Sequence, residues 1–363
     1  MDIDQASSPP APPRVWVLFG RGAGGNGQMQ SLAEALGWPY EIKQLHHNFL
    51  QVIPNVLLGA TRCTVDRDRS SVLAPPWPDL VIAASRRAAP VAQWIRRQSG
   101  GRTRLVHLLH VQAPLDRFDL IVTMPQFGLP ERGNILHVTG VLNRLDPGEL
   151  AAAAATWEPR LAHLPRPWMA LLAGGNSSAY LLDPATAAKL GREAGRLTAN
   201  TGGSLLVSTS PRTPADAADA LASAVHAALD TRCHIYKWKK ADAANNPYKA
   251  YLALADDFIV TIDSASLLVE ASATGKPVAV FDWPRRGGEG TGRAKSGLWR
   301  WGVEMGLFKP ARDFDAYFAE MRQRGLAHRF GEEAPRERQP LDDLERTVAR
   351  VRSLFDLRPE TGQ

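Results

Sequence analysis

The residues best suited to chemistry follow a short apolar run near position 260. Residues 258–262 are apolar and mostly β-branched or aromatic, which predicts a buried strand. Asp263, Ser264 and Ser266 come next and supply side chains of the kind that cap a helix. Glu270 stands one helical turn after Ser266 and is expected on the same helix face.

This arrangement suits a nucleotide. The start of a helix presents free backbone N–H groups and the positive end of the helix dipole, which together favour a phosphate. The carboxylate of Glu270 can accept hydrogen bonds from a ribose diol. The alternative is that Asp263 and the serines only cap a helix, and that Glu270 is an ordinary solvated helix residue.

A second motif at 206–214 predicts a contact for a diphosphate. A strand ends in hydroxyl residues that include Ser208 and Ser210, and Arg212 follows. Thr213 is the predicted N-cap of the next helix, so the Arg212 guanidinium is expected at a helix N-terminus, where it can bind phosphate oxygens bidentately. The alternative is a capped helix with a solvent-exposed arginine.

Two glycine-rich turns of similar sequence follow apolar strands. Residues 20–27 follow the strand 15–19, and Gly174 and Gly175 follow the strand 169–173. The first turn is not a P-loop, because Gln28-Met29 stands where Lys-Ser/Thr is required. The second turn is expected to approach the nucleotide. The first turn is expected to face an acceptor through Gly22, Gly25, Asn26 and Gln28.

The remaining pattern predicts an α/β fold. Helical runs at 88–98, 213–229 and 248–255 separate most of the short apolar segments, which favours parallel sheets covered on both faces. We therefore expect two Rossmann-like domains facing across a cleft, with ligands at the carboxyl ends of the strands. The further predicted strands are 80–83, 105–109, 120–123, 135–138, 205–208, 234–238 and 278–281.

Four other residues are candidates for the site. His107 and His110 flank a predicted strand, and either is a possible catalytic base or a packing residue. Asn246 precedes Pro247 and is the expected cap of a helix, and Tyr248 can stack on a base or pack between helix and sheet. No cluster of ligands in the sequence has the spacing of a metal site, so we expect metal-independent chemistry with no cofactor.

Composition sets the broad class. With 44% hydrophobic and 22% charged residues, the 363-residue chain is typical of a globular protein with room for two domains. Two distant cysteines argue against a disulfide framework, and no segment resembles a signal peptide or a membrane span, so we expect a cytoplasmic protein. A net charge of +6 suits RNA, anionic lipid or a diphosphate alike, but no nucleic-acid module is recognisable and no nucleic acid is expected.

The predicted boundaries follow the motifs. We expect a disordered leader at 1–13, an N-terminal Rossmann-like acceptor domain at 14–165 and a nucleotide-binding domain at 166–310, with a linker at 165–167. The segment 311–363 is expected to be helical and to pack back on the body, since 340–356 has the apolar spacing of an amphipathic helix.

The segment 46–58 is unusually apolar for a connection and has two interpretations. It is either a core strand and helix, which we favour, or an exposed apolar patch of the kind a lipid-borne acceptor requires.

Taken in order, these motifs resemble the "elongated mitochondria" fission-factor family over about residues 14–310. Two positions depart from the family pattern. Gln126-Phe127 stands where the family has a His-Asp pair, and Pro211 replaces a second basic residue before Arg212. The resemblance rests on Gly20-Arg-Gly, Gly25-Asn26 with Gln28, 32–37, Phe118-Asp119, Gly174-Gly175, 210–214, Asn246-Pro-Tyr248, 261–271 and Gly275-Lys-Pro277.

The resemblance implies two functions of different classes. Bacterial members of the family are described as glycosyltransferases of the two-Rossmann, GT-B type, which implies transfer of a sugar from a nucleotide-diphosphate donor to an acceptor, including a lipid-linked one at a membrane surface. Plant members promote mitochondrial division, which implies instead a non-enzymatic adaptor that recruits a division GTPase or a membrane partner.

Overall fold

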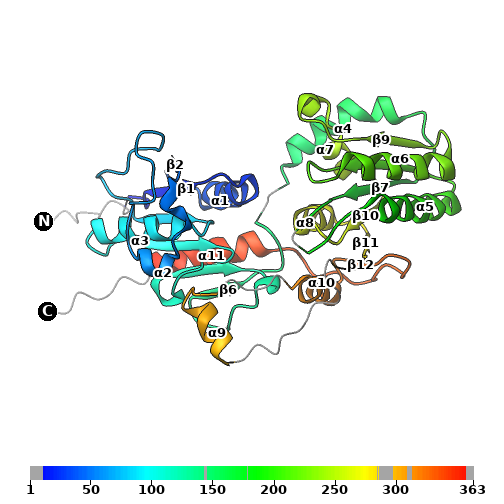
Figure 1. Ribbon diagram of the computed structural model, residues 1–363. Helices are drawn as coiled ribbons and strands as arrows, with labels where there is room; N and C mark the ends of the chain where they lie inside the picture. The colour runs from blue at the N-terminus through cyan, green and yellow to red at the C-terminus, as the bar shows by residue number, and fades with distance from the viewer. Residues whose placement is uncertain are drawn as a thin grey trace, which may run out of the picture. The chain divides into compact units, whose positions relative to one another are not determined.

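The computed structural model describes residues 11–142, 145–177, 179–283, 285, 297–308 and 313–356 (Figure 1). The first ten residues of the predicted leader lie outside this range. The chain divides into two compact units, each with its own sheet. The first unit comprises 1–138, 295–310 and 342–363, and the second comprises 139–294 and 311–341.

The first unit is built on a six-stranded parallel sheet in the order β2-β1-β3-β4-β5-β6. The strands are β1 (Val15–Phe19), β2 (Tyr40–Gln44), β3 (Leu80–Ala83), β4 (Arg104–Leu108), β5 (Leu120–Thr123) and β6 (Ile135–His137). The helices are α1 (Ala23–Leu36), α2 (Asn55–Leu58), α3 (Ala88–Gln98), α9 (Gly297–Glu304) and α11 (Asp343–Asp356), with short 3₁₀ helices η1 (Phe49–Val52), η2 (Leu115–Arg117) and η3 (Pro125–Phe127).

The second unit has a six-stranded parallel sheet in the order β12-β11-β10-β7-β8-β9. The strands are β7 (Trp168–Ala173), β8 (Ser204–Thr209), β9 (Cys233–Tyr236), β10 (Asp257–Thr261), β11 (Val278–Phe281) and β12 (His328–Arg329). The other elements are α4 (Pro147–Leu161), α5 (Pro184–Thr201), α6 (Ala215–Leu229), η4 (Lys240–Asn245), α7 (Tyr248–Leu254), α8 (Ala265–Ala273) and α10 (Phe314–Gln323).

The strand order places a switch point in each sheet. Numbered from its own first strand, the second sheet runs 3-2-1-4-5-6, the order of the dinucleotide-binding Rossmann fold. The strands β8 and β9 lie on one side of β7, and β10, β11 and β12 lie on the other side. The strand order therefore reverses between β7 and β10. In the first sheet the corresponding point lies between β1 and β3. The predicted α/β class with two Rossmann-like units is confirmed.

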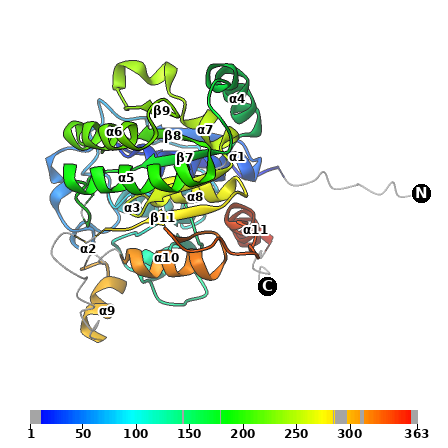
Figure 2. The same ribbon diagram turned by 90° about the vertical axis from the view of Figure 1, so that its right-hand side faces the viewer.

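Two glycines explain how α5 and α6 pack side by side on one face of the second sheet (Figure 2). A Cβ added at Gly191 would lie 2.7 Å from the carbonyl oxygen of Leu221, and one at Gly195 would lie 2.6 Å from the Cβ of Ala228. Both distances are too short for a side chain, so these two positions allow the helix axes to approach closely.

The division between the units differs from the predicted one. It falls at 138/139, before α4, whereas the prediction placed it at 165–167. The reason is α4, a helix that we did not predict: it packs on α7, and Trp157 of α4 contacts the ring of His234 with centroids 5.5 Å apart. The linker Pro165-Arg-Pro therefore lies inside the second unit.

The C-terminal segment also divides. The expectation that 311–363 packs back on the body as one piece is too simple, since α10 and β12 belong to the second unit and α11 to the first. The predicted amphipathic helix is present as α11 and packs on α1. Val351 is fully buried there, and Arg352 donates to the carbonyl of Leu36 at 3.1 Å.

The interpretation of 46–58 as core is wrong. Phe49, Val52 and Leu57 are exposed, and Asn55 is buried in their place. No helix among the described residues combines the length and apolar content that crossing a bilayer requires.

Candidate functional site

Three loops meet at the carboxyl edge of the second sheet. They follow β7, β8 and β10, and hydrogen bonds join them directly. Ser210 Oγ donates to the carbonyl of Gly174 at 2.6 Å, and Thr213 Oγ1 donates to the same carbonyl. Gly174 N donates to Thr261 Oγ1 at 2.7 Å. The predicted residues of these three loops are therefore neighbours, at the β7–β10 switch point.

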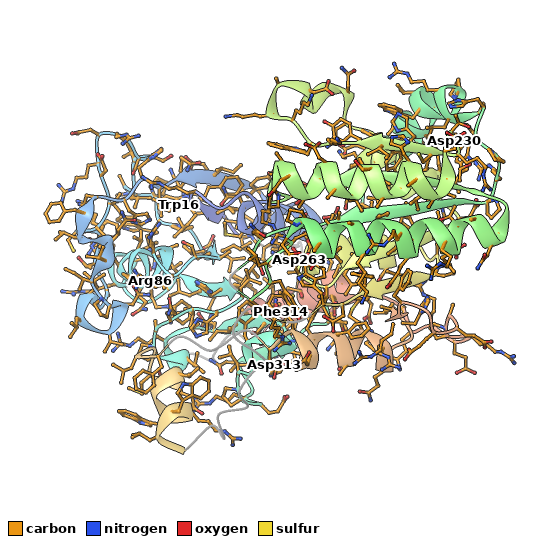
Figure 3. The ribbon with its side chains drawn as sticks, turned by 45° about the vertical axis from the view of Figure 1, so that its right-hand side comes forward. Trp16, Arg86, Asp230, Asp263, Asp313 and Phe314 are labelled. Atoms are coloured by element: carbon orange, nitrogen blue, oxygen red, sulfur yellow. The ribbon has the colours of Figure 1, made fainter. Side chains whose placement is uncertain are left out.

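Asp263, which is labelled in Figure 3, contacts two of the three loops of this junction. Its side chain has no exposed surface, and its Oδ2 accepts from Gly175 N at 2.9 Å and forms an ion pair with Arg212 Nη2 at 3.0 Å. Burial raises the pKa of this carboxyl, and the charge of Arg212 and the N–H of Gly175 oppose the rise. Asp263 therefore joins the loops from a buried position, and its side chain has no exposed surface that a ligand could contact.

The glycines are required by close approach. A Cβ at Gly174 would collide with the carboxylate of Asp263, and one at Gly175 would collide with the backbone of Arg212. Asn176 completes the junction, because its N–H donates to the carbonyl of Arg212 at 2.9 Å and its Oδ1 accepts from Leu182 N at the same distance.

Arg212 remains available on one side. Its side chain is 42% exposed although Nη2 faces Asp263, and Nη1 donates to the carbonyl of Asn176 at 3.4 Å. Thr213, the predicted cap of the following helix, does not cap it. The structure places Pro214 there, and the Thr213 hydroxyl accepts from Ser210 N at 3.0 Å. Hydrogen bonds of Ser210 and Thr213 therefore hold this loop, and the guanidinium of Arg212 is left half-exposed.

The helix α8 begins beside this junction. Ser264 is its N-cap and accepts from Leu267 N, as predicted. The other N–H groups of a first helical turn have no intrahelical acceptor and point away from the helix start. No acidic residue lies in the first turn, so the dipole there is not offset within α8.

A second group of polar residues lies further along α8. Glu270 Oε2 accepts from the hydroxyl of Tyr248 at 2.7 Å, and Oε1 accepts from Ser266 Oγ at 3.3 Å. Burial, together with the neighbouring Glu270 carboxylate, raises the pKa of Tyr248 well above its usual range, so this phenol stays protonated and donates. Asn246 Oδ1 accepts from Tyr248 N at 3.0 Å and fixes the start of α7.

Ser208 does not join either group. It is buried inside β8, paired in register with Leu172 and Tyr236, and it precedes the loop. Thr261 and Thr213 bind the glycine loop directly and were not among the predicted site residues. Their position in the sequence could have identified them, since Thr261 ends β10 just before Asp263 and Thr213 directly follows Arg212.

The first glycine-rich segment is helical rather than a turn. α1 begins at Ala23, so Gly25, Asn26 and Gln28 lie in its first turns, and Gly22 is its cap residue. Asn26 clamps the preceding bend by donating to the carbonyl of Gly20 at 2.9 Å and accepting from Gly20 N at 3.1 Å. Gln28 is buried and donates to the carbonyl of Gly24 at 3.2 Å. Among these four, Gly22 is exposed.

His107 is a core residue and the prediction of a catalytic role for it is wrong. Its ring has no exposed surface, lies edge-on to Phe118 and bonds through Nε2 to the carbonyl of Ser85 at 3.2 Å. Burial lowers the pKa of His107 to about 4. A ring that no substrate reaches cannot act as its base.

His110 lies at the carboxyl end of β4 and is half-buried. Its ring stacks on Phe127, with centroids 6.3 Å apart, so a residue of the Gln126-Phe127 pair that departs from the family pattern contacts it directly. Leu109 and Gln112 on either side have positive φ angles of 67° and 47°, a backbone conformation that non-glycine residues seldom adopt outside constrained sites. In the described part of the chain, no group of three or more His, Cys, Asp or Glu side chains is placed to hold a metal ion.

A family model described as Mitochondrial fission ELM1 matches residues 23–300, which include parts of both units. The chain belongs to this family. The ELM1 match includes all three loops of the second-unit junction and α8, together with residues 23–27 of the first glycine-rich segment.

Two relatives are similar over long stretches. The mitochondrial fission protein ELM1 of Arabidopsis thaliana is 30% identical over 225 residues, which cover 56% of this chain and 51% of that protein. This chain therefore spans about half the length of the Arabidopsis relative. The uncharacterized protein RP120 of Rickettsia prowazekii (strain Madrid E) is 25% identical over 299 residues, covering 74% of this chain and 82% of that one.

Two solved structures are similar to the chain at low TM-scores. A UDP-GlcNAc 2-epimerase from Methanocaldococcus jannaschii has a TM-score of 0.47 at 12% identity and covers 94% of this chain and 99% of its own. The catalytic domain of starch synthase IV from Arabidopsis thaliana, bound to ADP and acarbose, has a TM-score of 0.44 at 11% identity, with 94% and 100% coverage. Likenesses at these scores carry no argument about this chain.

Proposed function

We propose that the second unit binds a nucleoside diphosphate at the β7–β10 switch point, and that the chain transfers a sugar from a nucleotide-diphosphate donor. One observation carries the proposal: the three loops that follow β7, β8 and β10 are joined around Asp263, at the place where open parallel sheets bind their ligands.

The diphosphate would lie against the start of α8. The positive end of the helix dipole there and the exposed side of Arg212 both favour negative charge. Within the protein, Arg212 is paired with Asp263. The attraction for a diphosphate would therefore come chiefly from the start of α8 and from the guanidinium N–H groups of Arg212 that do not face Asp263. The same groups would stabilise the charge that develops on the departing diphosphate.

The ribose would be held by Glu270. The hydroxyl of Tyr248 donates to one oxygen of this carboxylate and the hydroxyl of Ser266 donates to the other. These two bonds fix the orientation of the carboxylate relative to α8, which is what selective recognition of a diol needs. The proposed acceptor side is the first unit, with His110 as the group that takes the proton of the acceptor hydroxyl.

Calorimetry with UDP, ADP and UMP tests the binding step, and the melting temperature is followed for every variant. We expect UDP or ADP to bind, and Glu270→Ala to weaken binding by about 1.5–3 kcal/mol while leaving inorganic phosphate affinity unchanged. Tyr248→Phe is the matched control, since it removes one hydrogen bond of Glu270 and keeps the carboxylate. If both variants weaken nucleotide and phosphate alike, Glu270 has only a structural role.

Arg212→Lys separates diphosphate recognition from simple charge. A lysine keeps the charge but not the paired donors, so we expect UDP binding to weaken by about 1–3 kcal/mol and UMP binding to weaken less, because UMP lacks the outer phosphate. Unchanged affinity for both, together with a large fall in melting temperature, would assign Arg212 to the fold alone.

One observation favours the adaptor alternative. Arg212 already has an internal partner in Asp263, so the junction is satisfied without a ligand. A relative in this family is named a fission protein, and a chain that recruits a division GTPase or a membrane partner needs the fold but no nucleotide. Absence of binding across a panel of nucleotides and nucleotide sugars, with wild-type folding intact, would decide for the adaptor.

A further inference from the structure

The segment from η1 to α2 has its polarity reversed. Phe49, Val52 and Leu57 are 80%, 76% and 77% exposed, although side chains of this kind are normally buried. Asn55, between them, is 5% exposed and donates to the carbonyls of Arg86 at 2.8 Å and Gln112 at 3.0 Å. The segment therefore turns an amide inward and its large apolar groups outward.

This arrangement is held in place by specific contacts. Asn48 caps η1 by accepting from Leu50 N at 3.0 Å, and its amide donates to the carbonyl of Cys63 at 2.8 Å. Arg86, labelled in Figure 3, donates to the carbonyl of Gln51 at 2.7 Å. A segment fixed by these five side-chain hydrogen bonds presents its apolar groups as a defined surface.

The helix α9 carries further exposed apolar side chains in the same unit. Leu298 is 72% and Trp301 is 52% exposed. The turn after α9 packs on the loop that Asn55 also binds, because a Cβ at Gly306 would lie 2.5 Å from Ala113 N. Figures 1 and 2 both show α9 and α2 toward the same corner of the first unit. We call Phe49, Val52, Leu57, Leu298 and Trp301 the apolar rim.

Most of the charges beside the apolar rim are positive, and Glu304 at the end of α9 is paired with Arg132. No Asp or Glu occurs between positions 42 and 65. Arg21 and Arg87 are exposed and lie close enough to His47 to lower its pKa, although burial is the larger cause, and Arg300 is exposed on α9. No carboxylate among the described residues forms an ion pair with these three arginines. Asp66 and Asp68 alternate with Arg67 and Arg69, so that stretch adds no net charge.

From these observations we propose that the apolar rim and its arginines dock the first unit on an anionic lipid surface. This goes beyond the proposed nucleotide site, which lies in the other unit. Aromatic and aliphatic groups enter the boundary between head groups and acyl chains, while nearby arginines bind lipid phosphates, and together these two contributions give reversible surface binding. A protein partner would not require the run of positions without acidic residues.

Vesicle flotation tests the proposal on the full chain. We expect binding to phosphatidylcholine vesicles that contain phosphatidylglycerol, weaker binding to pure phosphatidylcholine, and loss of binding as salt rises. Phe49→Ser with Leu57→Ser should weaken binding at least about tenfold, since two large apolar side chains are removed from the lipid contact. Arg21→Gln with Arg87→Gln should weaken binding to the anionic vesicles and leave binding to the neutral ones unchanged.

The matched control is Val72→Ser. Val72 is 76% exposed in the same unit but lines a different surface, near Arg14 and Pro75, so its replacement should leave vesicle binding unchanged. Equal binding by wild type and by the Phe49/Leu57 variant would overturn the proposal, as would no vesicle binding by wild type. A dimer on size exclusion that the Phe49/Leu57 variant dissociates, without vesicle binding, would assign the surface to a second copy of the chain instead.

Discussion

At the scale of single residues, the pair Arg212–Asp263 decides how the junction behaves. A fully buried carboxylate is tolerated because a guanidinium and a backbone N–H face it. The same guanidinium is the proposed diphosphate ligand, so one residue serves the fold and the site. Its two roles can be separated by measuring stability without any nucleotide.

We expect Arg212→Gln to lower the free energy of unfolding by about 1–3 kcal/mol, because the Asp263 charge then lacks its partner. Asp263→Asn in the same chain should restore part of this loss, since the buried group is then neutral and still accepts from Gly175 N. Denaturant unfolding of the two single variants and the double variant measures the coupling. Strictly additive losses would show that the ion pair contributes nothing.

His107 predicts a pH dependence of stability. Its pKa is about 4 in the folded chain and 6.5 in the unfolded one, so the unfolded chain takes up a proton first as the pH falls. The stability contribution is complete above pH 6.5 and is lost toward pH 4, by up to about 3 kcal/mol. His107→Gln keeps a donor for Ser85 and removes this titration, so its unfolding free energy should fall less over that range.

His226→Gln serves as the control for that experiment, because His226 is exposed and belongs to the second unit. Its pH profile should follow that of wild type. Parallel profiles for wild type and His107→Gln would contradict the assignment of His107 to the core in its neutral form.

At the scale of elements, most strands and helices could be predicted because β-branched runs and capping residues lie next to each other in sequence. β3, β5 and β11 have the predicted bounds, and Ser264 caps α8 as expected. The first glycine-rich segment was misjudged, since Asn26 bonds both backbone groups of Gly20 and thereby lets α1 begin among the glycines. A contact of this kind depends on three-dimensional structure that local sequence patterns do not report.

The burial of individual side chains was also predicted poorly from the sequence. The segment 46–58 was predicted as core because it is apolar, yet Phe49, Val52 and Leu57 are exposed and Asn55 is buried. Likewise, His107 and His110 are three positions apart and look alike in sequence, but one is in the core and the other lies at the sheet edge. Sequence spacing predicts which face of an element a side chain occupies more readily than what covers that face.

The helix α11 supports an element-scale prediction. Val351→Asp should destabilise the first unit by at least about 3 kcal/mol, because it places a charge in a fully buried position. Ala349→Asp makes a similar change two positions earlier on the exposed face and should alter stability by less than about 0.5 kcal/mol. Thermal unfolding of both variants tests this, and equal losses would mean that α11 does not contribute to the fold of the first unit.

At the scale of the whole molecule, the chain crosses between its two units more than once. Residues 295–310 and 342–363 return to the first unit after the second has been built. The predicted order of two consecutive domains therefore holds for the two sheets but not for the later helices, since α9 and α11 complete the first unit from the far end of the sequence. No local sequence pattern indicates that a later helix packs on an earlier unit.

The central claim is that the second unit binds a nucleoside diphosphate at its switch point. Hydrogen–deuterium exchange of the full chain, with and without saturating UDP or ADP, tests it most directly. We expect slower exchange of the backbone amides of 174–177, 210–215 and 261–268, and the same experiment on Glu270→Ala should show weaker protection at equal nucleotide concentration. Exchange unchanged in all three segments, or protection confined to the first unit, would contradict it.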